Sequence, residues 1–168
     1  SINKGYVDHC RKMAKDLKKE YNLSPESFMI DIAGNDGALL NEFKEEIGLH
    51  VLNIDPAANL IPYCHQKGIP HWATFWGEEA AHMVLTRFAG ASKSGEDYHD
   101  PRADIITATN VFAHVDDVRE FIEAAKIVLK PEGVLILEFP YLIDFIENNE
   151  FDTIYFEHLS YFSIWPLI

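Results

Sequence analysis

The chain has 168 residues, of which 48% are hydrophobic, and this length and composition predict one compact domain over residues 1–168. Its 14 basic and 27 acidic residues give a formal net charge of −13, which repels nucleic acid and anionic lipid, so we expect neither as a partner. Two cysteines without paired spacing, and a sequence with no signal-peptide pattern and no long apolar run, indicate a protein of the reducing cytoplasm.

Residues 1–20 are predicted to form an amphipathic helix. Tyr6, Cys10 and Leu17 are among the apolar residues that recur at helical spacing between charged ones. The apolar stripe of such a helix packs on a core while its charged side faces water. We therefore expect this helix to lie across a sheet as a lid or brace.

Apolar runs and amphipathic segments alternate along the rest of the chain, which is typical of parallel strands joined by helices. Residues 89–102 are rich in Gly, Ser, Asp and Lys, and are predicted to be a surface loop. Residues 131–133 are expected to turn into the last strand. The predicted strands are 28–32, 50–54, 69–74, 104–109 and 134–139, and the predicted helices run from Leu39 to near Gly48 and over 59–66, 78–88 and 118–129.

These elements predict an α/β fold of the Rossmann-like type. The strands are almost continuously apolar, so both faces of the sheet are expected to be buried under helices. The predicted sheet is mostly parallel, with about five strands and right-handed crossovers between them.

The segment 29–40 is the most informative part of the chain. Its apolar strand turns through small residues into a helix, which is how open α/β sheets build a site for a nucleotide-like cofactor. The next apolar strand ends in Asp55, whose carboxylate is placed to accept hydrogen bonds from both hydroxyls of a ribose. Strand, turn, helix, strand and acid thus occur in the order that such a site needs.

The turn favours S-adenosylmethionine over a dinucleotide. It lacks the G-x-G-x-x-G pattern that holds a pyrophosphate, and Asp36 would repel that group. S-adenosylmethionine carries no phosphate, and its ammonium and sulfonium groups would be attracted by Asp31 or Asp36. A dehydrogenase that binds NAD is the alternative. The predicted cofactor-binding residues are Asp31, Gly34, Asn35, Asp36, Gly37, Asp55, Pro56 and Asn110.

Three parts of the sequence carry a resemblance to a known family: 31–40, the pair 110–115 and 129–134, and 152–163. Through them the chain resembles class I S-adenosylmethionine-dependent methyltransferases, and more narrowly the sugar C-methyltransferases that act on nucleotide-linked 4-keto-deoxysugars. The resemblance departs at Ala33 and Gly34, where the family usually has glycine and often serine. It implies the central domain alone, without a cysteine-rich zinc domain before it, an α/β domain after it, or a terminal antiparallel strand pair.

The resemblance also implies a chemistry. In the resembling enzymes a base removes a proton beside a ketone, and the enolate that forms takes the methyl group. His158 is implied as this base and Tyr155 as the hydroxyl that holds the enolate oxygen, and both share a face only if the chain turns helically there. His114 either contacts the substrate or bonds the backbone at the start of a helix. Glu157 is implied to position substrate or to fix its loop.

Other aromatic and histidine residues are not assigned to the site. Trp72, Phe75 and Trp76 could flank the adenine of the cofactor, but bulky residues at a strand end are more often core, so these three are predicted to belong to the core. The remaining histidines show no liganding spacing on a predicted helix, so no metal is predicted.

The acceptor is expected to be a small molecule, such as a keto-deoxysugar nucleotide. The alternative is a module or fragment that keeps the cofactor crevice but has no activity alone, because the nucleotide-holding domain of the family is not in this sequence. The chain starts without methionine and ends in apolar residues, so we expect it to be cut from a longer protein. The tail 150–168 and an open sheet edge predict a homodimer, or an edge covered by residues 155–168.

Overall fold

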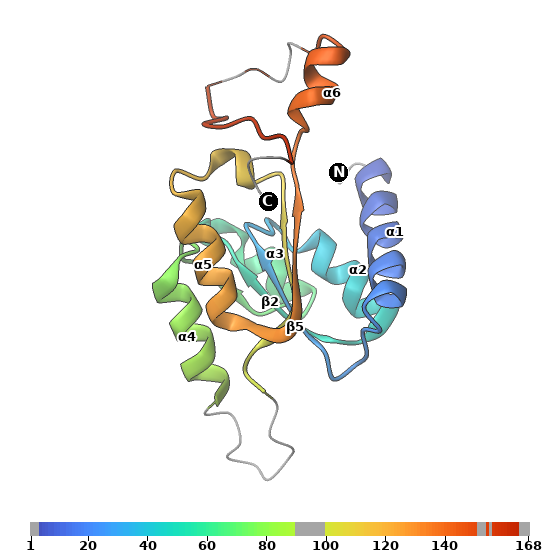
Figure 1. Ribbon diagram of the computed structural model, residues 1–168. Helices are drawn as coiled ribbons and strands as arrows, with labels where there is room; N and C mark the ends of the chain where they lie inside the picture. The colour runs from blue at the N-terminus through green and yellow to red at the C-terminus, as the bar shows by residue number, and fades with distance from the viewer. Residues whose placement is uncertain (1–3, 90–99, 151–153, 155, 165–168) are drawn as a thin grey trace.

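The computed structural model describes residues 4–89, 100–150, 154 and 156–164. Its sheet holds, in spatial order, β3 (His71–Trp72), β2 (His50–Ile54), β1 (Phe28–Ile32), β4 (Ala103–Thr109) and β5 (Leu129–Glu138), and all neighbours run parallel. Helices α1 (Lys4–Glu20), α2 (Ala38–Ile47) and α3 (Ile61–Gln66) pack on one face, and α4 (Glu78–Ala89) and α5 (Val118–Val128) cover the other (Figure 1). This arrangement confirms the predicted α/β Rossmann-like class. None of the described helices is long and apolar enough to cross a membrane.

The predicted elements are confirmed with three corrections. β1 and β2 have the predicted bounds, whereas β3 is shorter than expected. Residues 131–133 are not a turn before β5 but part of it, since Leu129 already pairs with Ala103 and the register then shifts so that Val134 pairs with Ile105. The short helix α6 (Leu142–Glu147) was not predicted, because its six residues are too few to establish a helical period. Of the predicted surface loop, residues 90–99 lie outside the described part.

Two apolar cores hold the central strand. Ile30 and Ile32 of β1 face a cluster under α4 and α5, whereas Met29 faces a second cluster under α1 and α2. All five residues of β1 are buried, as expected of a strand covered on both faces. Each fully buried side chain of this size contributes about 1.5–3 kcal/mol. The carboxyl end of β1, and the loop that follows it, are therefore held from both sides.

Helix α1 lies beside α2 and acts as the predicted brace. Cys10 and Ala14 are buried in its interface with the sheet and α2. Its exposed side is joined to α2 by an ion pair of 2.9 Å between Arg11 and Glu42. His9 Nε2 lies 2.7 Å from a carboxylate oxygen of Glu138, at the carboxyl end of β5. The start of α1 is thereby tied to the edge of the sheet where ligands bind in open α/β folds.

Residues 156–164 of the tail lie beyond the carboxyl end of β5, where α6 also lies (Figure 1). Tyr141 and Phe162 form a parallel bridge, and the Leu142 N–H donates to the Phe162 carbonyl at 2.9 Å. This bridge lies beyond β5, which pairs only with β4 among the described residues. The outer edge of β5 is thus open in the described part, and the homodimer through it stays a prediction.

Candidate active site

The loop between β1 and α2 has a backbone that must be held in place by contacts. Ala33 and Asn35 have φ angles of 54° and 52°, a left-handed conformation that costs a residue other than glycine about 1–2 kcal/mol. The Ala33 N–H donates to the Ile54 carbonyl at 2.8 Å, and the Asn35 N–H donates to Oδ2 of Asp55 at 3.1 Å. The end of β2 therefore fixes this loop.

Asp55 lies where a ribose-binding acid is expected. It is 7% exposed, and its second oxygen, Oδ1, accepts a hydrogen bond from the Ala57 N–H at 2.8 Å. Each carboxylate oxygen has two acceptor positions, so one on each oxygen remains after these backbone bonds. The carboxylate of Asp55 is therefore not turned toward bulk water and keeps two free acceptor positions, although Asp55 itself lines neither of the cavities described below.

Asp31 and Gly34 are in contact below the loop surface. A Cβ on Gly34 would collide with Oδ2 of Asp31 and would lie 2.7 Å from Oδ1 of Asn53, so only glycine fits there. Asp31 is fully buried and lines neither of the cavities described below. Burial raises the pKa of Asp31 to about 7; the hydrogen bond from Thr107 opposes this rise and the charge of Asp55 adds to it. The structure thus gives no support for a direct charge contact of Asp31 with a cofactor.

Asp36 is engaged by the protein itself. Its Oδ2 forms an ion pair of 2.8 Å with Lys67, whose ammonium also donates to the Asp36 carbonyl at 2.6 Å. Its Oδ1 accepts a hydrogen bond from the Ala38 N–H at 3.2 Å, at the start of α2. Lys67 thus compensates part of the charge of Asp36, which borders the loop cavity described below, and the attraction of the cofactor by Asp36 stays a prediction.

Two cavities open on either side of this loop. The first, which we call the loop cavity, has a volume of about 580 Å³ and is bordered by Gly34, Asn35 and Asp36. Tyr6 of α1 and Tyr63 of α3 form its outer wall. Neither tyrosine was predicted, since only the packing of α1 and α3 brings these helices to the loop.

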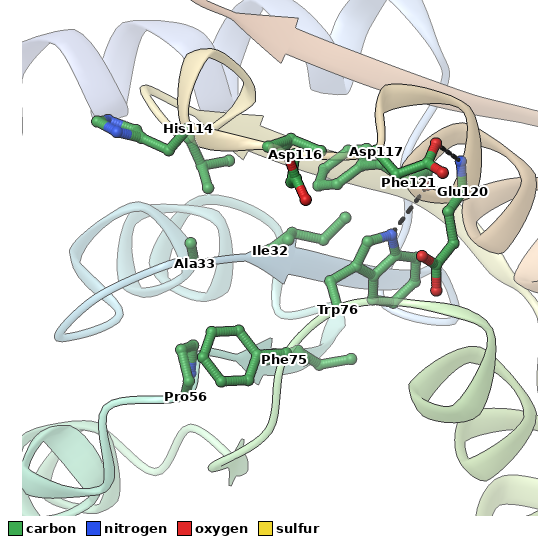
Figure 2. Close-up of a pocket in the computed structure, with 13 residues that line it drawn as sticks. Ile32, Ala33, Pro56, Phe75, Trp76, His114, Asp116, Asp117, Glu120 and Phe121 are labelled. Atoms are coloured by element: carbon green, nitrogen blue, oxygen red, sulfur yellow. Dashed lines mark hydrogen bonds between the residues drawn. The ribbon is translucent and has the colours of Figure 1, made fainter. Parts of the chain in front are cut away.

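The second cavity, which we call the apolar cavity, has a volume of about 410 Å³, and Ala33 of the loop is one of the residues that line it. Figure 2 shows Ile32 and Ala33 in its middle, with Pro56 and Phe75 on one side and His114 on the other. Phe75 is 79% exposed and forms part of the wall, so its prediction as a core residue is wrong. The position of Phe75 shortly after β3, at the edge of the sheet where ligands bind, was the sequence feature that pointed to a place in the cavity wall.

Trp76 and Trp72 have structural contacts that set the position of this wall. The Trp76 indole N–H donates to the Phe121 carbonyl at 3.0 Å, which joins the loop after β3 to α5 (Figure 2). Trp72 packs against the core beneath α4 and α5, and the guanidinium of Arg87 lies 5.1 Å above its ring. Both residues are partly buried and pack against this core, so their prediction as core residues is confirmed only in part, and Trp76 also borders the apolar cavity.

A histidine pair lies where β4 and the tail meet. Nδ1 of His114 lies 2.7 Å from the Glu157 carbonyl, so this nitrogen is the donor and Nε2 of a neutral ring is the one that can accept a proton. The ring centroid of His158 lies 4.9 Å from that of His114 and 5.7 Å from that of Tyr161. Tyr155 lies outside the described residues. The structure thus brings His114, Glu157 and His158 together, and of these three His114 lines the apolar cavity.

The remaining predicted residues are placed differently. Pro56 lines the apolar cavity, and Gly37, with a φ of 74°, precedes α2 and packs on Ile69. Asn110 turns the chain after β4 with a φ of 55° and donates its N–H to the Glu138 carbonyl at 2.8 Å, but it lines neither cavity. Within the described part of the chain, His, Cys, Asp and Glu form no group of three or more suited to a metal ion.

Comparisons with known proteins agree with this geometry. A family described as "Methyltransferase domain" matches residues 8–165. The curated protein "C-methyltransferase NovU" of Streptomyces niveus is 29% identical over 161 residues, which cover 96% of this chain and 35% of NovU. The chain therefore spans about a third of that relative.

Solved structures with a similar fold include two proteins of bacterial origin. DesVI of Streptomyces venezuelae has a TM-score of 0.56 at 14% identity, covering 83% of this chain and 52% of DesVI. CalS10 of Micromonospora echinaspora, described as an amino pentose methyltransferase with SAM bound, has a TM-score of 0.57 at 15% identity, covering 81% of this chain and 52% of CalS10. At this level of identity the likeness concerns the fold alone.

Proposed function

We propose that this chain, which belongs to the methyltransferase-domain family, binds S-adenosyl-L-methionine and transfers its methyl group to a small molecule. One observation carries the proposal: a strained loop, pinned to Asp55, separates two cavities at the carboxyl edge of the sheet. The ribose hydroxyls would bind Asp55, and the adenine would lie in the apolar cavity beside Pro56 and Phe75. The amino acid part of the cofactor would occupy the loop cavity.

We further propose that the acceptor is a ketone-bearing sugar nucleotide or similar small molecule, methylated at carbon. The similarity to a protein described as a C-methyltransferase supports this class. Further support comes from His114, which lines the apolar cavity, and from His158, whose ring lies beside that of His114. Carbon methylation needs a base there, because an unactivated C–H bond is no nucleophile.

In the proposed reaction an imidazole nitrogen of His158 takes the proton from the carbon beside the ketone. The electron pair of that C–H bond forms the enolate, whose oxygen is held by the Tyr155 hydroxyl. S-adenosyl-L-methionine, when bound, would supply the methyl group to the enolate carbon, so that a C–C bond would replace the C–S bond and the sulfonium would leave as a thioether. His114 borders the acceptor and, through the Glu157 carbonyl, fixes the segment that carries His158.

A second candidate is a cofactor-binding module that performs no chemistry alone. It is favoured by the coverage of only 35% of NovU, and by a net charge of −13 that would repel an anionic sugar nucleotide. In this case the remaining contacts to the acceptor would come from other parts of a longer protein.

Isothermal titration with S-adenosylhomocysteine and NAD tests the cofactor. Binding of the first without the second supports the proposal, and the reverse refutes it in favour of a dehydrogenase. Deuterium exchange beside the ketone of a 4-keto sugar nucleotide, with S-adenosylhomocysteine present, then tests the chemistry. Exchange that is lost in His158→Ala supports the enzyme, whereas S-adenosylhomocysteine binding without exchange in the unmodified chain supports the module.

A further inference from the structure

Polar residues form one row across four neighbouring strands. The register pairs Asp31 with Asn53 on β2 and with Thr107 on β4, and it pairs Asn53 with His71 on β3. Paired residues of neighbouring strands point to the same side of a sheet, here the side under α1, α2 and α3. Asp31, Asn53 and Thr107 are fully buried. We call these four residues the polar row, and it lies directly beneath Gly34.

The hydrogen bonds of the polar row have a gap at its centre. The Thr107 hydroxyl donates to Oδ1 of Asp31 at 2.7 Å, and Nδ2 of Asn53 donates to the Asn35 carbonyl at 2.8 Å. Oδ2 of Asp31 and Oδ1 of Asn53 have no partner in the described part of the chain. Both of these acceptor atoms converge on the point that a Cβ on Gly34 would occupy. A single proton between them would satisfy both, whereas a buried acceptor left without a donor costs about 1–3 kcal/mol.

We propose that Asp31 is held as a neutral carboxylic acid whose Oδ2 hydroxyl donates to Oδ1 of Asn53, and that this acid–amide pair positions the cofactor loop. Asp31 is then a positioning residue that does not touch the cofactor. The inference rests on the proposed cofactor site, since the loop that it positions is the one assigned there to S-adenosyl-L-methionine. The hydroxyl proton fixes the orientation of the Asn53 amide, with Oδ1 toward Asp31 and Nδ2 toward Asn35.

The link to the cofactor runs through the backbone of Asn35. Its carbonyl accepts from Asn53 and its N–H donates to Asp55, so both of its polar groups are held while its φ stays at 52°. An ionised Asp31 needs a donor at Oδ2, and the amide of Asn53 supplies one only by turning Nδ2 away from Asn35. Oδ1 of Asn53 would then face the Asn35 carbonyl, and two acceptors repel. Ionisation of Asp31 therefore releases the loop and weakens cofactor binding.

The charged and titratable groups around Asp31 favour the neutral acid. Burial is the largest influence on its pKa, and no positive charge is among the groups that act on Asp31 in the described part of the chain. Asp55 faces it from β2, and Tyr6 and Cys10 face it from α1, each with a pKa raised mainly by burial. Cys64 of α3 and His71 of β3 border the far side of Asn53, at 3.3 and 3.2 Å from Nδ2.

The test is the affinity for S-adenosylhomocysteine from pH 5.5 to pH 8.5, measured by isothermal titration on the unmodified chain and on Asp31→Asn. Asparagine keeps the shape of the neutral acid and can donate to Asn53, so this variant should bind as tightly as the unmodified chain at pH 6. The unmodified chain should lose affinity about ten-fold as the pH rises by one to two units through the pKa of Asp31. Asp31→Asn should lose most of this dependence. The matched control Asp104→Asn removes a carboxylate that pairs with Lys130 at the start of β4, and should keep the full pH dependence.

Two outcomes would overturn the inference: equal pH dependence in the unmodified chain and Asp31→Asn, or binding at pH 6 that Asp31→Asn weakens ten-fold although circular dichroism shows it folded. The free protein supplies an independent readout, the carboxyl ¹³C shift of Asp31 as a function of pH. A neutral Asp31 at pH 6 supports the acid–amide pair even if no cofactor binds, in which case the proposed function alone fails. An ionised Asp31 at pH 6 refutes the pair whatever the cofactor does.

Discussion

Folding stability should fall as the pH rises from 5 to 8, because Asp31 is fully buried and its native pKa is raised from 3.8 to about 7. The unfolded chain gains free energy by ionising this carboxyl above pH 4, whereas the native chain cannot do so until the pH approaches 7. Stability from the neutral acid is therefore complete below pH 4 and is lost as the pH rises toward 7. Between pH 5 and pH 8 the loss from this group amounts to about 2–3 kcal/mol.

Urea unfolding followed by circular dichroism at pH 5, 6, 7 and 8 measures this loss. The informative quantity is the difference between the unmodified chain and Asp31→Asn, since the histidines titrate alike in both proteins. The difference in unfolding free energy between Asp31→Asn and the unmodified chain should change by about 2 kcal/mol from pH 5 to pH 8, in favour of Asp31→Asn. Parallel stability curves for the two proteins would refute the assignment of a raised pKa to Asp31.

Three further substitutions test the site. Gly34→Ala places a methyl group against Asp31 and should cost about 1–3 kcal/mol in urea unfolding, together with most of the S-adenosylhomocysteine affinity; an unchanged affinity would contradict the close packing of the loop. Lys67→Met removes the partner of the partly buried Asp36 and should weaken S-adenosylhomocysteine binding several-fold in isothermal titration, and tighter binding would instead show that the charge of Asp36 serves the cofactor. Trp76→Phe loses the hydrogen bond to the Phe121 carbonyl and should lower the unfolding free energy by about 1 kcal/mol, with no change expected if water replaces the indole.

Sequence patterns were sufficient to predict the elements whose structure depends on residues close by in the sequence. The apolar runs that end at Ile32 and Ile54 predicted β1 and β2 at their observed bounds, and Gly48 ends α2 with a φ of 82° as expected of a terminal glycine. The turn after β1 and the acid at Asp55 were found in the same way, since their order along the chain defines the site.

Predictions about the surroundings of single side chains were weaker, because the sequence does not show which residues lie next to them in space. Asp36 was expected to attract a cation of the cofactor, and the sequence did not show that Lys67, from the end of α3, forms an ion pair with it. Phe75 was expected in the core, but it lines the apolar cavity. In both cases the sequence does not show which residues of other elements surround the side chain.

The sequence by itself determined the order of strands and helices, the fold class and the place of the cofactor loop, because hydrophobic periodicity and turn residues act over short distances along the chain. Only the tertiary structure decided that Asp31 lies sealed beneath Gly34 and that His158 meets His114. These contacts join residues of different strands and of the tail. They depend on strand register and crossover packing, which local patterns do not encode.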